Sequence, residues 1–128
     1  MESGEAVRAF DQALERLKEV LAEPETAVIR DAAIKRFEFT FELAWKATQR
    51  VLRDQGILCR SPKDCFREAF AFGPTQDNPL WIRMMDDRNL TVHTYNEKTA
   101  HKIYQNLKDY LPLFEQLRQG LASQLGPT

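Results

Sequence analysis

Hydrophobic positions along the chain recur with the period of an α-helix in almost every segment. Over residues 5–22 they are spaced by four, three and four residues, which gives one apolar stripe on a first helix. The stripe consists of Phe10, Leu14, Leu17 and Leu21. Pro24 interrupts the pattern, because a proline cannot extend a helix and restrains the residue before it. The sequence therefore predicts a first helix over about residues 5–22.

The second predicted helix is the longest and starts near Ala27. We expect Gly56 to end it, because a glycine can take the left-handed conformation at a helix C-terminus. The helical period continues through this whole segment. Its inward positions are Ile34, Phe37, Phe41, Ala44, Trp45, Thr48 and Leu52.

Two shorter helices are each marked by a capping residue followed by proline. Ser61-Pro62 and Asn78-Pro79 place a side-chain acceptor before a proline in the first turn, and Gly73-Pro74 ends the first of the two helices. Their expected inward residues are Cys65, Phe66, Ala69 and Phe70 in the first helix and Trp81, Met84 and Met85 in the second.

The segment from Asn89 to Asn96 is poor helix sequence, since it is rich in Asn, Thr and a β-branched Val. We therefore expect a break or a strained turn there. A last long helix follows, and Pro112 should kink it. Its inward residues are Ile103, Leu107, Tyr110, Leu111, Phe114 and Leu117.

These elements define the predicted fold class. No segment alternates with period two, and no Asn-Gly or Asp-Gly pair separates two apolar runs, so no strand is expected. The prediction is an all-α protein, an antiparallel up-and-down four-helix-type bundle with one extra short helix. The bundle should occupy residues 1–120, with a flexible tail over residues 121–128.

Composition adds limits but no function. The chain has 128 residues, which fits one domain. Its net charge of −1 demands neither a nucleic-acid nor a membrane partner, although a balanced total can hide a local basic patch. No apolar run approaches the ~20 residues of a membrane span. The acidic start, Met1 to Glu5, does not resemble a signal peptide, so the expected location is the cytoplasm.

Cysteine and histidine positions argue against a metal centre. Cys59 and Cys65 fit no zinc-binding spacing, and the nearest histidine lies far along the chain. In a chain without an export signal, they are expected to be free thiols in a reducing compartment. The sequence therefore predicts neither a metal nor a cofactor.

Candidate chemistry lies in the polar segment over residues 86–97. An arginine such as Arg88 can hold a phosphate through two hydrogen bonds, and a histidine such as His93 can move a proton near neutral pH. That pair suits metal-independent cleavage of RNA by a ribose 2′-hydroxyl. On a regular helix Arg88 and Tyr95 share a face, while His93 lies about 140° from Arg88. A local distortion or a second chain would be needed to bring them together. From the spacing alone, a cluster of caps and salt bridges at a helix end is the more frequent case.

A family resemblance favours the catalytic interpretation. The pattern Arg88-x4-His93-x-Tyr95 matches the motif of HEPN proteins that are paired with minimal nucleotidyltransferases. The segment over residues 36–46, RFEFTFELAWK, resembles the signature of their nucleotidyltransferase substrate-binding subfamily, as do residues 87–91 and 95–97. The likeness extends over about residues 6–119.

The resemblance implies a homodimeric helical bundle with the two motifs facing each other across the dimer cleft. It implies that Arg88 and His93 cleave RNA without a metal and that Asn89 helps to position them. It also implies that a partner nucleotidyltransferase adds AMP to Tyr95 and silences the nuclease. The predicted function is therefore the ribonuclease toxin of a toxin–antitoxin pair. The alternatives are a non-catalytic adaptor that presents a substrate or its own tyrosine to the nucleotidyltransferase, and a plain structural bundle.

Other polar residues have simpler interpretations. Glu38 and Glu42 could line a groove, but pairing with neighbouring Lys and Arg residues on the exposed face is the more frequent case. His101 is expected at the surface. The chain has no glycine-rich phosphate loop, so it should not itself transfer nucleotides. The basic residues of the middle segment could attract RNA or could be a solvated helix face; they are Arg30, Lys35, Arg36, Lys46, Arg50, Arg53, Arg60, Lys63 and Arg67.

Overall fold

The computed structural model describes residues 2–73 and 78–125, and their regular elements are all helical. No strand occurs among these residues, so the predicted all-α class is confirmed. In chain order the elements are α1 (Ser3–Leu21), α2 (Ala27–Asp54), α3 (Pro62–Phe72), α4 (Leu80–Leu90), the 3₁₀ turn η1 (Thr91–His93) and α5 (Glu97–Ser123).

Helix boundaries follow the local signals in the sequence. The hydroxyl of Thr26 accepts a hydrogen bond from the backbone N–H of Ile29 at 3.0 Å and so caps α2. The hydroxyl of Ser61 accepts one from the N–H of Asp64 at 3.2 Å and so caps α3. Gly73 ends α3 with a left-handed φ of 112°, which only glycine adopts without strain. Pro74 lies outside the described residues.

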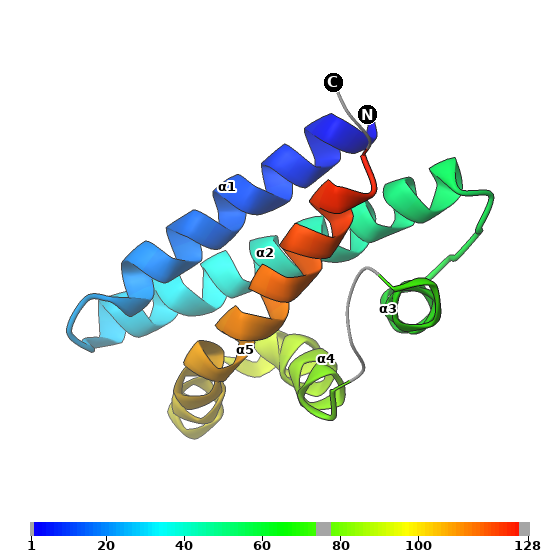
Figure 1. Cartoon of the computed structure of the whole chain (residues 1–128). Helices are drawn as coiled ribbons and strands as arrows, with labels where there is room; N and C mark the ends of the chain where they lie inside the picture. The colour runs from blue at the N-terminus through cyan, green and yellow to red at the C-terminus, as the bar shows by residue number, and fades with distance from the viewer. Residues whose placement is uncertain (1, 74–77, 126–128) are drawn as a thin grey trace.

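The long helices lie side by side. Figure 1 shows α1 and α2 running antiparallel along their lengths, with the second part of α5 beside them. In the same view α5 changes direction between its first and second parts, as the internal Pro112 predicts. The short helices α3 and α4 cover the remaining side of α2 and α5. The architecture is therefore the predicted bundle.

The main core is rich in aromatic rings, and a smaller cluster surrounds Leu52, Cys59 and Cys65. The rings of Phe37 and Tyr110 stack with centroids 5.8 Å apart, which joins α2 to α5. Phe66 lies 4.5 Å from Trp81, which joins α3 to α4. Aromatic pairs at these separations stabilise a core beyond the burial of their area. The Trp81 ring also lies 6.3 Å from the ring of Phe114 on α5, so α4 is anchored to both α3 and α5.

The predicted break over residues 89–96 is confirmed, whereas one boundary differs from the prediction. Helix α4 ends at Leu90, and the 3₁₀ turn η1 separates it from α5. No non-glycine residue in the described ranges has a positive φ. At the other end, α5 continues to Ser123 and Leu121 is buried, which extends the bundle beyond residue 120.

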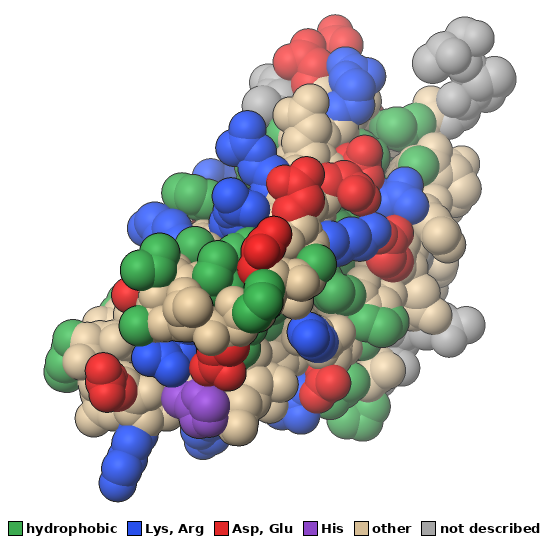
Figure 2. Space-filling model, turned by 90° about the vertical axis from the view of Figure 1, so that its left-hand side faces the viewer, with side chains coloured by type: hydrophobic (Ala, Val, Ile, Leu, Met, Phe, Trp, Pro, Cys, Tyr) green, Lys and Arg blue, Asp and Glu red, His purple; other side chains and the backbone are tan. Residues whose placement is uncertain are grey.

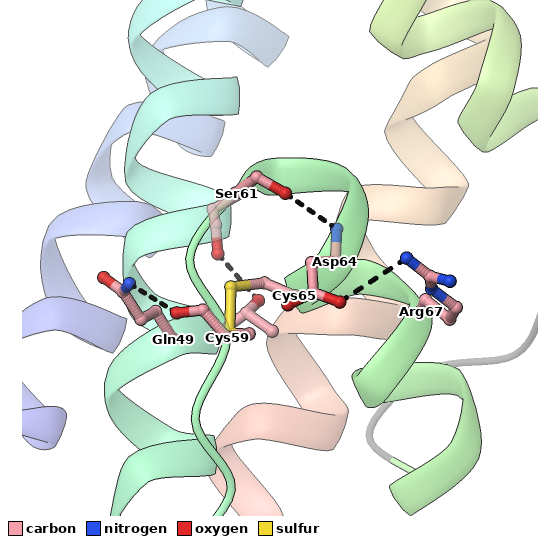
Figure 3. The surroundings of a disulfide bond; sticks show 8 residues. Gln49, Cys59, Ser61, Asp64, Cys65 and Arg67 are labelled. Atoms are coloured by element: carbon pink, nitrogen blue, oxygen red, sulfur yellow. Dashed lines mark hydrogen bonds and ion pairs between the residues drawn. A yellow bond between two sulfur atoms is a disulfide. The ribbon is translucent and has the colours of Figure 1, made fainter.

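The prediction of free thiols is wrong. Cys59 and Cys65 form a disulfide that joins the α2–α3 loop to the first turn of α3 (Figure 3). The loop folds back onto α2, where the side chain of Gln49 donates a hydrogen bond to the carbonyl of Cys59 at 2.8 Å. This path brings the two Cα atoms to 5.1 Å, a separation that a spacing of six residues does not itself specify. Among the described residues, no helix is long and apolar enough to cross a membrane.

Candidate active site

Arg88 lies in the last turn of α4 and faces α2. Its Nη2 atom is 3.4 Å from Oε2 of Glu42, and its guanidinium carbon is 5.8 Å from the centre of the Phe41 ring. The Arg88 side chain remains 41% exposed. The guanidinium is therefore oriented by α2 and still accessible to a ligand.

Glu42 is the centre of a small polar network on α2. Its carboxylate accepts a hydrogen bond from the indole N–H of Trp45 at 3.1 Å and forms an ion pair with Lys46 at 3.3 Å. Burial raises the pKa of Glu42, but the contacts with Trp45, Lys46 and Arg88 outweigh this effect and leave the pKa below its usual value. The carboxylate is charged at neutral pH. Because its contact with Arg88 is long and partly exposed, a phosphate can compete with it.

A groove lies between α2, the start of α3 and α4, and we call it the α2–α4 groove. Its volume is about 500 Å³, within the range of small-molecule sites. Arg88 and Asn89, two of the expected site residues, both line it. The lining residues are Phe41, Glu42, Trp45, Ser61, Pro62, Lys63, Ile82, Met85, Asp86, Arg88 and Asn89.

His93 and Tyr95 form a second exposed group at the break between α4 and α5. The Tyr95 hydroxyl is 3.4 Å from Nδ1 of His93, and the two rings meet edge to face with centroids 5.9 Å apart. Tyr95 is 83% exposed, which agrees with the expectation of an accessible hydroxyl. The N-cap of α5 follows directly, where the Asn96 side chain accepts hydrogen bonds from the N–H groups of Lys98 and Thr99.

The structure thus brings the expected residues together in two pairs. Arg88 and Asn89 line the groove, whereas His93 and Tyr95 contact each other outside it. Within residues 2–73 and 78–125, no hydrogen bond joins Arg88 to either member of the second pair. The 3₁₀ turn interrupts the helix between Arg88 and Tyr95, so the shared face expected from their seven-residue spacing does not form.

Asp87 is a functional candidate that our sequence analysis did not single out. Its side chain is buried, and it accepts hydrogen bonds from the Tyr110 hydroxyl at 2.5 Å and from the Asn106 amide at 3.0 Å. Burial and the bond to Asp87 raise the pKa of the Tyr110 hydroxyl, which therefore remains a donor. Asp87 continues the three-residue spacing of Trp81 and Met84, and this spacing is the signal that could have indicated its inward position. It fixes α4 against α5 immediately beside Arg88.

The remaining charged residues fit the simpler interpretation. Figure 2 shows basic side chains interspersed with acidic and hydrophobic ones on one face of the molecule. Several of the basic residues named above form ion pairs, including Lys35 with Glu38 and Arg67 with Asp64. His101 is half-exposed and lies 3.4 Å from Glu25. Among the described residues, no three His, Cys, Asp or Glu side chains converge to form a metal site.

Comparisons with known proteins agree on one family. Residues 5–123 match the family model described as nucleotidyltransferase substrate binding protein like. A Haemophilus influenzae protein named probable ribonuclease HepT is 38% identical over 96 residues, which are 68% of this chain and 66%, just under two thirds, of that protein.

Two solved structures share the fold. One is a protein from Thermus thermophilus, with a TM-score of 0.81 and 45% identity over 91% of this chain and 99% of that chain. The other, from Haemophilus influenzae, is described as revealing the fold of a substrate-binding domain of a nucleotidyltransferase. It has a TM-score of 0.81 and 28% identity over 91% of this chain and 98% of that chain.

Proposed function

Because the chain belongs to the nucleotidyltransferase substrate-binding-like family of HEPN proteins, we propose that it is a ribonuclease whose catalytic residues are Arg88 and His93. The observation that carries the proposal is the partly exposed Arg88 guanidinium at the rim of a groove, followed five residues later by an exposed histidine. A relative at 38% identity bears the name of a probable ribonuclease.

The chemistry needs no metal. A ribose 2′-oxygen attacks the adjacent phosphorus, the bond from phosphorus to the 5′-oxygen breaks, and the products are a cyclic phosphate and a 5′-hydroxyl. His93 takes the proton from the 2′-hydroxyl or gives one to the leaving oxygen, and water makes the other proton transfer. Arg88 donates hydrogen bonds to the phosphate oxygens as charge develops on them, and Asn89 positions the phosphate from the same rim.

A second copy of the chain completes the site in this proposal. One chain places His93 outside the groove that holds Arg88, and apolar side chains around the motif are exposed, with Ile82 63% and Val92 72% accessible. A two-fold axis through this surface would bring each motif to the other copy, because a two-fold interface is formed by the same patch on both subunits.

The proposed partner is a small nucleotidyltransferase that acts as the antitoxin by transferring AMP to Tyr95. The Tyr95 hydroxyl is exposed and lies beside His93, so a nucleotide attached there would occupy the space where RNA meets the histidine. Co-expression with the nucleotidyltransferase and mass spectrometry should place AMP on the peptide that contains Tyr95. Modification of a Tyr95→Phe variant would contradict this assignment.

A non-catalytic adaptor is the second candidate function. It is favoured by the contact between Arg88 and Glu42 and by the description of one structural relative as a substrate-binding domain. The two functions differ in one measurable property, which is RNA cleavage by the purified chain.

The decisive experiment compares two matched pairs of variants in RNA cleavage and growth toxicity. Arg88→Ala and His93→Ala should each lower the cleavage rate on the order of 100-fold or more without unfolding the protein. Arg67→Ala and His101→Ala are the controls, because both residues are exposed and lie outside the groove. EDTA should leave cleavage intact. Normal cleavage by the His93 variant would reject the catalytic assignment.

A further inference from the structure

We propose that the α2–α4 groove is a binding subsite for one unpaired nucleobase of the RNA, next to the phosphate that Arg88 contacts. This inference rests on the proposed ribonuclease function and names the part of the substrate that the groove recognises. The volume of about 500 Å³ accommodates a single nucleoside.

The groove offers an aromatic surface. Trp45 supplies it, because its ring is only half-buried in the lining and its indole N–H donates a hydrogen bond to Glu42. The Phe41 ring is buried beneath the Arg88 guanidinium and supports that side chain from below. Unpaired bases bind proteins mainly by stacking on such rings, whereas a base within a duplex is not available for stacking. The aromatic lining therefore favours single-stranded RNA.

The groove also carries both signs of charge. Arg88 and Lys63 supply cations for a phosphate, although Arg88 also contacts the Glu42 carboxylate. Asp86 supplies a second carboxylate and Asn89 an amide. A ligand that was only anionic would be repelled by Asp86, and an apolar peptide would leave all these groups unpaired. A nucleotide whose base bears an amino group satisfies both sets, because its phosphate pairs with the cations and its amino N–H groups donate to the carboxylate.

The wall formed by the start of α3 is fixed before any ligand binds. Ser61 caps α3, and the disulfide between Cys59 and Cys65 closes the short segment that includes Pro62 and Lys63 (Figure 3). Trp45 packs against the same disulfide-containing cluster. A preorganised pocket loses less conformational entropy when a base enters it.

The test measures binding separately from cleavage. His93→Ala serves as the background, because His93 lies outside the groove and its loss should prevent turnover. Short single-stranded RNA oligomers, each made of one kind of base and labelled with fluorescein, are titrated with the protein. Binding is followed by fluorescence anisotropy. Trp45→Leu should weaken binding by on the order of 10-fold or more. Phe39→Leu is the matched control, since Phe39 is an exposed aromatic residue on α2 outside the groove and should change binding little.

A second pair of variants tests whether Asp86 recognises the amino group of the base. This test does not depend on the folding of Trp45→Leu. Oligomers of A or C should bind more tightly than oligomers of U, and Asp86→Ala should reduce this preference. Asp31→Ala, at an exposed position on α2 outside the groove, should keep it. The subsite is overturned if duplex and single-stranded RNA bind with equal affinity. It is also overturned if Trp45→Leu and Asp86→Ala change RNA binding no more than their controls, Phe39→Leu and Asp31→Ala, do.

Two further outcomes identify a different ligand. Competition by free AMP at concentrations comparable to the oligomer would assign the groove to a mononucleotide and overturn the RNA subsite. A change of oligomeric state in Trp45→Leu, with RNA affinity unchanged, would assign it to a second copy of the chain. If neither Trp45→Leu nor Asp86→Ala changes RNA binding while the wild type still cleaves RNA, only the subsite is rejected. If the wild type binds RNA but does not cleave it, the ribonuclease function is rejected.

Discussion

At the residue scale, the guanidinium of Arg88 interacts with Glu42 in the absence of RNA. Their 3.4 Å contact and partial exposure make it an ion pair that a phosphate can replace. Glu42→Gln keeps the shape and an acceptor for Trp45 while it removes the competing charge. We expect RNA to bind a few-fold more tightly to this variant, as measured by anisotropy. Glu38→Gln, which affects the pair with Lys35 on the same helix, should have little effect.

The same carboxylate predicts a pH dependence. The lowered pKa of Glu42 means that its ion pairs stabilise the protein at any pH above the ordinary value of 4.5 and are lost as pH falls through the lowered pKa. The affinity difference between Glu42→Gln and wild type should therefore stay constant from about pH 8 to about pH 5. It should shrink only at lower pH. A difference that disappears near the pKa of histidine would show that Glu42 is not the responsible group.

Tyr110 supports the site through Asp87. Tyr110→Phe removes a hydrogen bond to a buried carboxylate, so the free energy of unfolding should fall by about 1–3 kcal/mol in a denaturant titration. Because Asp87 is the neighbour of Arg88, the cleavage rate should fall as well. Tyr104→Phe on the same helix is the control, since the Tyr104 side chain is only partly buried. If both variants lose the same free energy of unfolding, the hydrogen bond from Tyr110 to Asp87 does not stabilise the fold more than a partly exposed tyrosine hydroxyl does.

At the element scale, the disulfide fixes the start of α3 and thereby one wall of the groove. Closing a segment of this length should stabilise the fold by about 2 kcal/mol through the entropy of the unfolded chain. Reduction of the wild type should lower its melting temperature and weaken RNA binding. The double variant Cys59→Ala, Cys65→Ala should show both effects without reductant and should not respond to it. Unchanged melting of the reduced wild type would contradict this role.

At the scale of the whole molecule, we predict a homodimer built around the motif. Val92 is exposed between Arg88 and His93, so Val92→Asp should shift the protein to a monomer in light scattering at micromolar concentration and abolish cleavage. Val28→Asp is the matched control, because Val28 is similarly exposed at the start of α2 and is not part of the motif. A wild-type monomer under these conditions would count against the dimer.

Mixing two inactive variants tests whether the chains share a site. If Arg88 of one chain works with His93 of its partner, then mixing Arg88→Ala with His93→Ala chains restores part of the activity, because one site of each mixed dimer is intact. A site contained within one chain would stay inactive in every mixed dimer.

The helices and their inward faces could be predicted from the sequence. Capping by Thr26 and Ser61, termination at Gly73 and the stripe from Phe10 to Leu21 depend on residues within about one helical turn of each other. The polar segment at the break of α4 and α5 was evident for the same reason, as was the family to which the chain belongs. Such features depend on neighbouring residues alone, so they can be predicted without knowing how the helices pack.

Only the tertiary structure decided which distant groups meet. Glu42 and Arg88 are 46 residues apart, and their contact follows from the packing of α4 against α2. The bond from Tyr110 to Asp87, the α2–α4 groove and the Cys59–Cys65 disulfide likewise depend on where helices and a loop lie in space. No local period specifies these distances, because they result from the simultaneous burial of all apolar faces in one core.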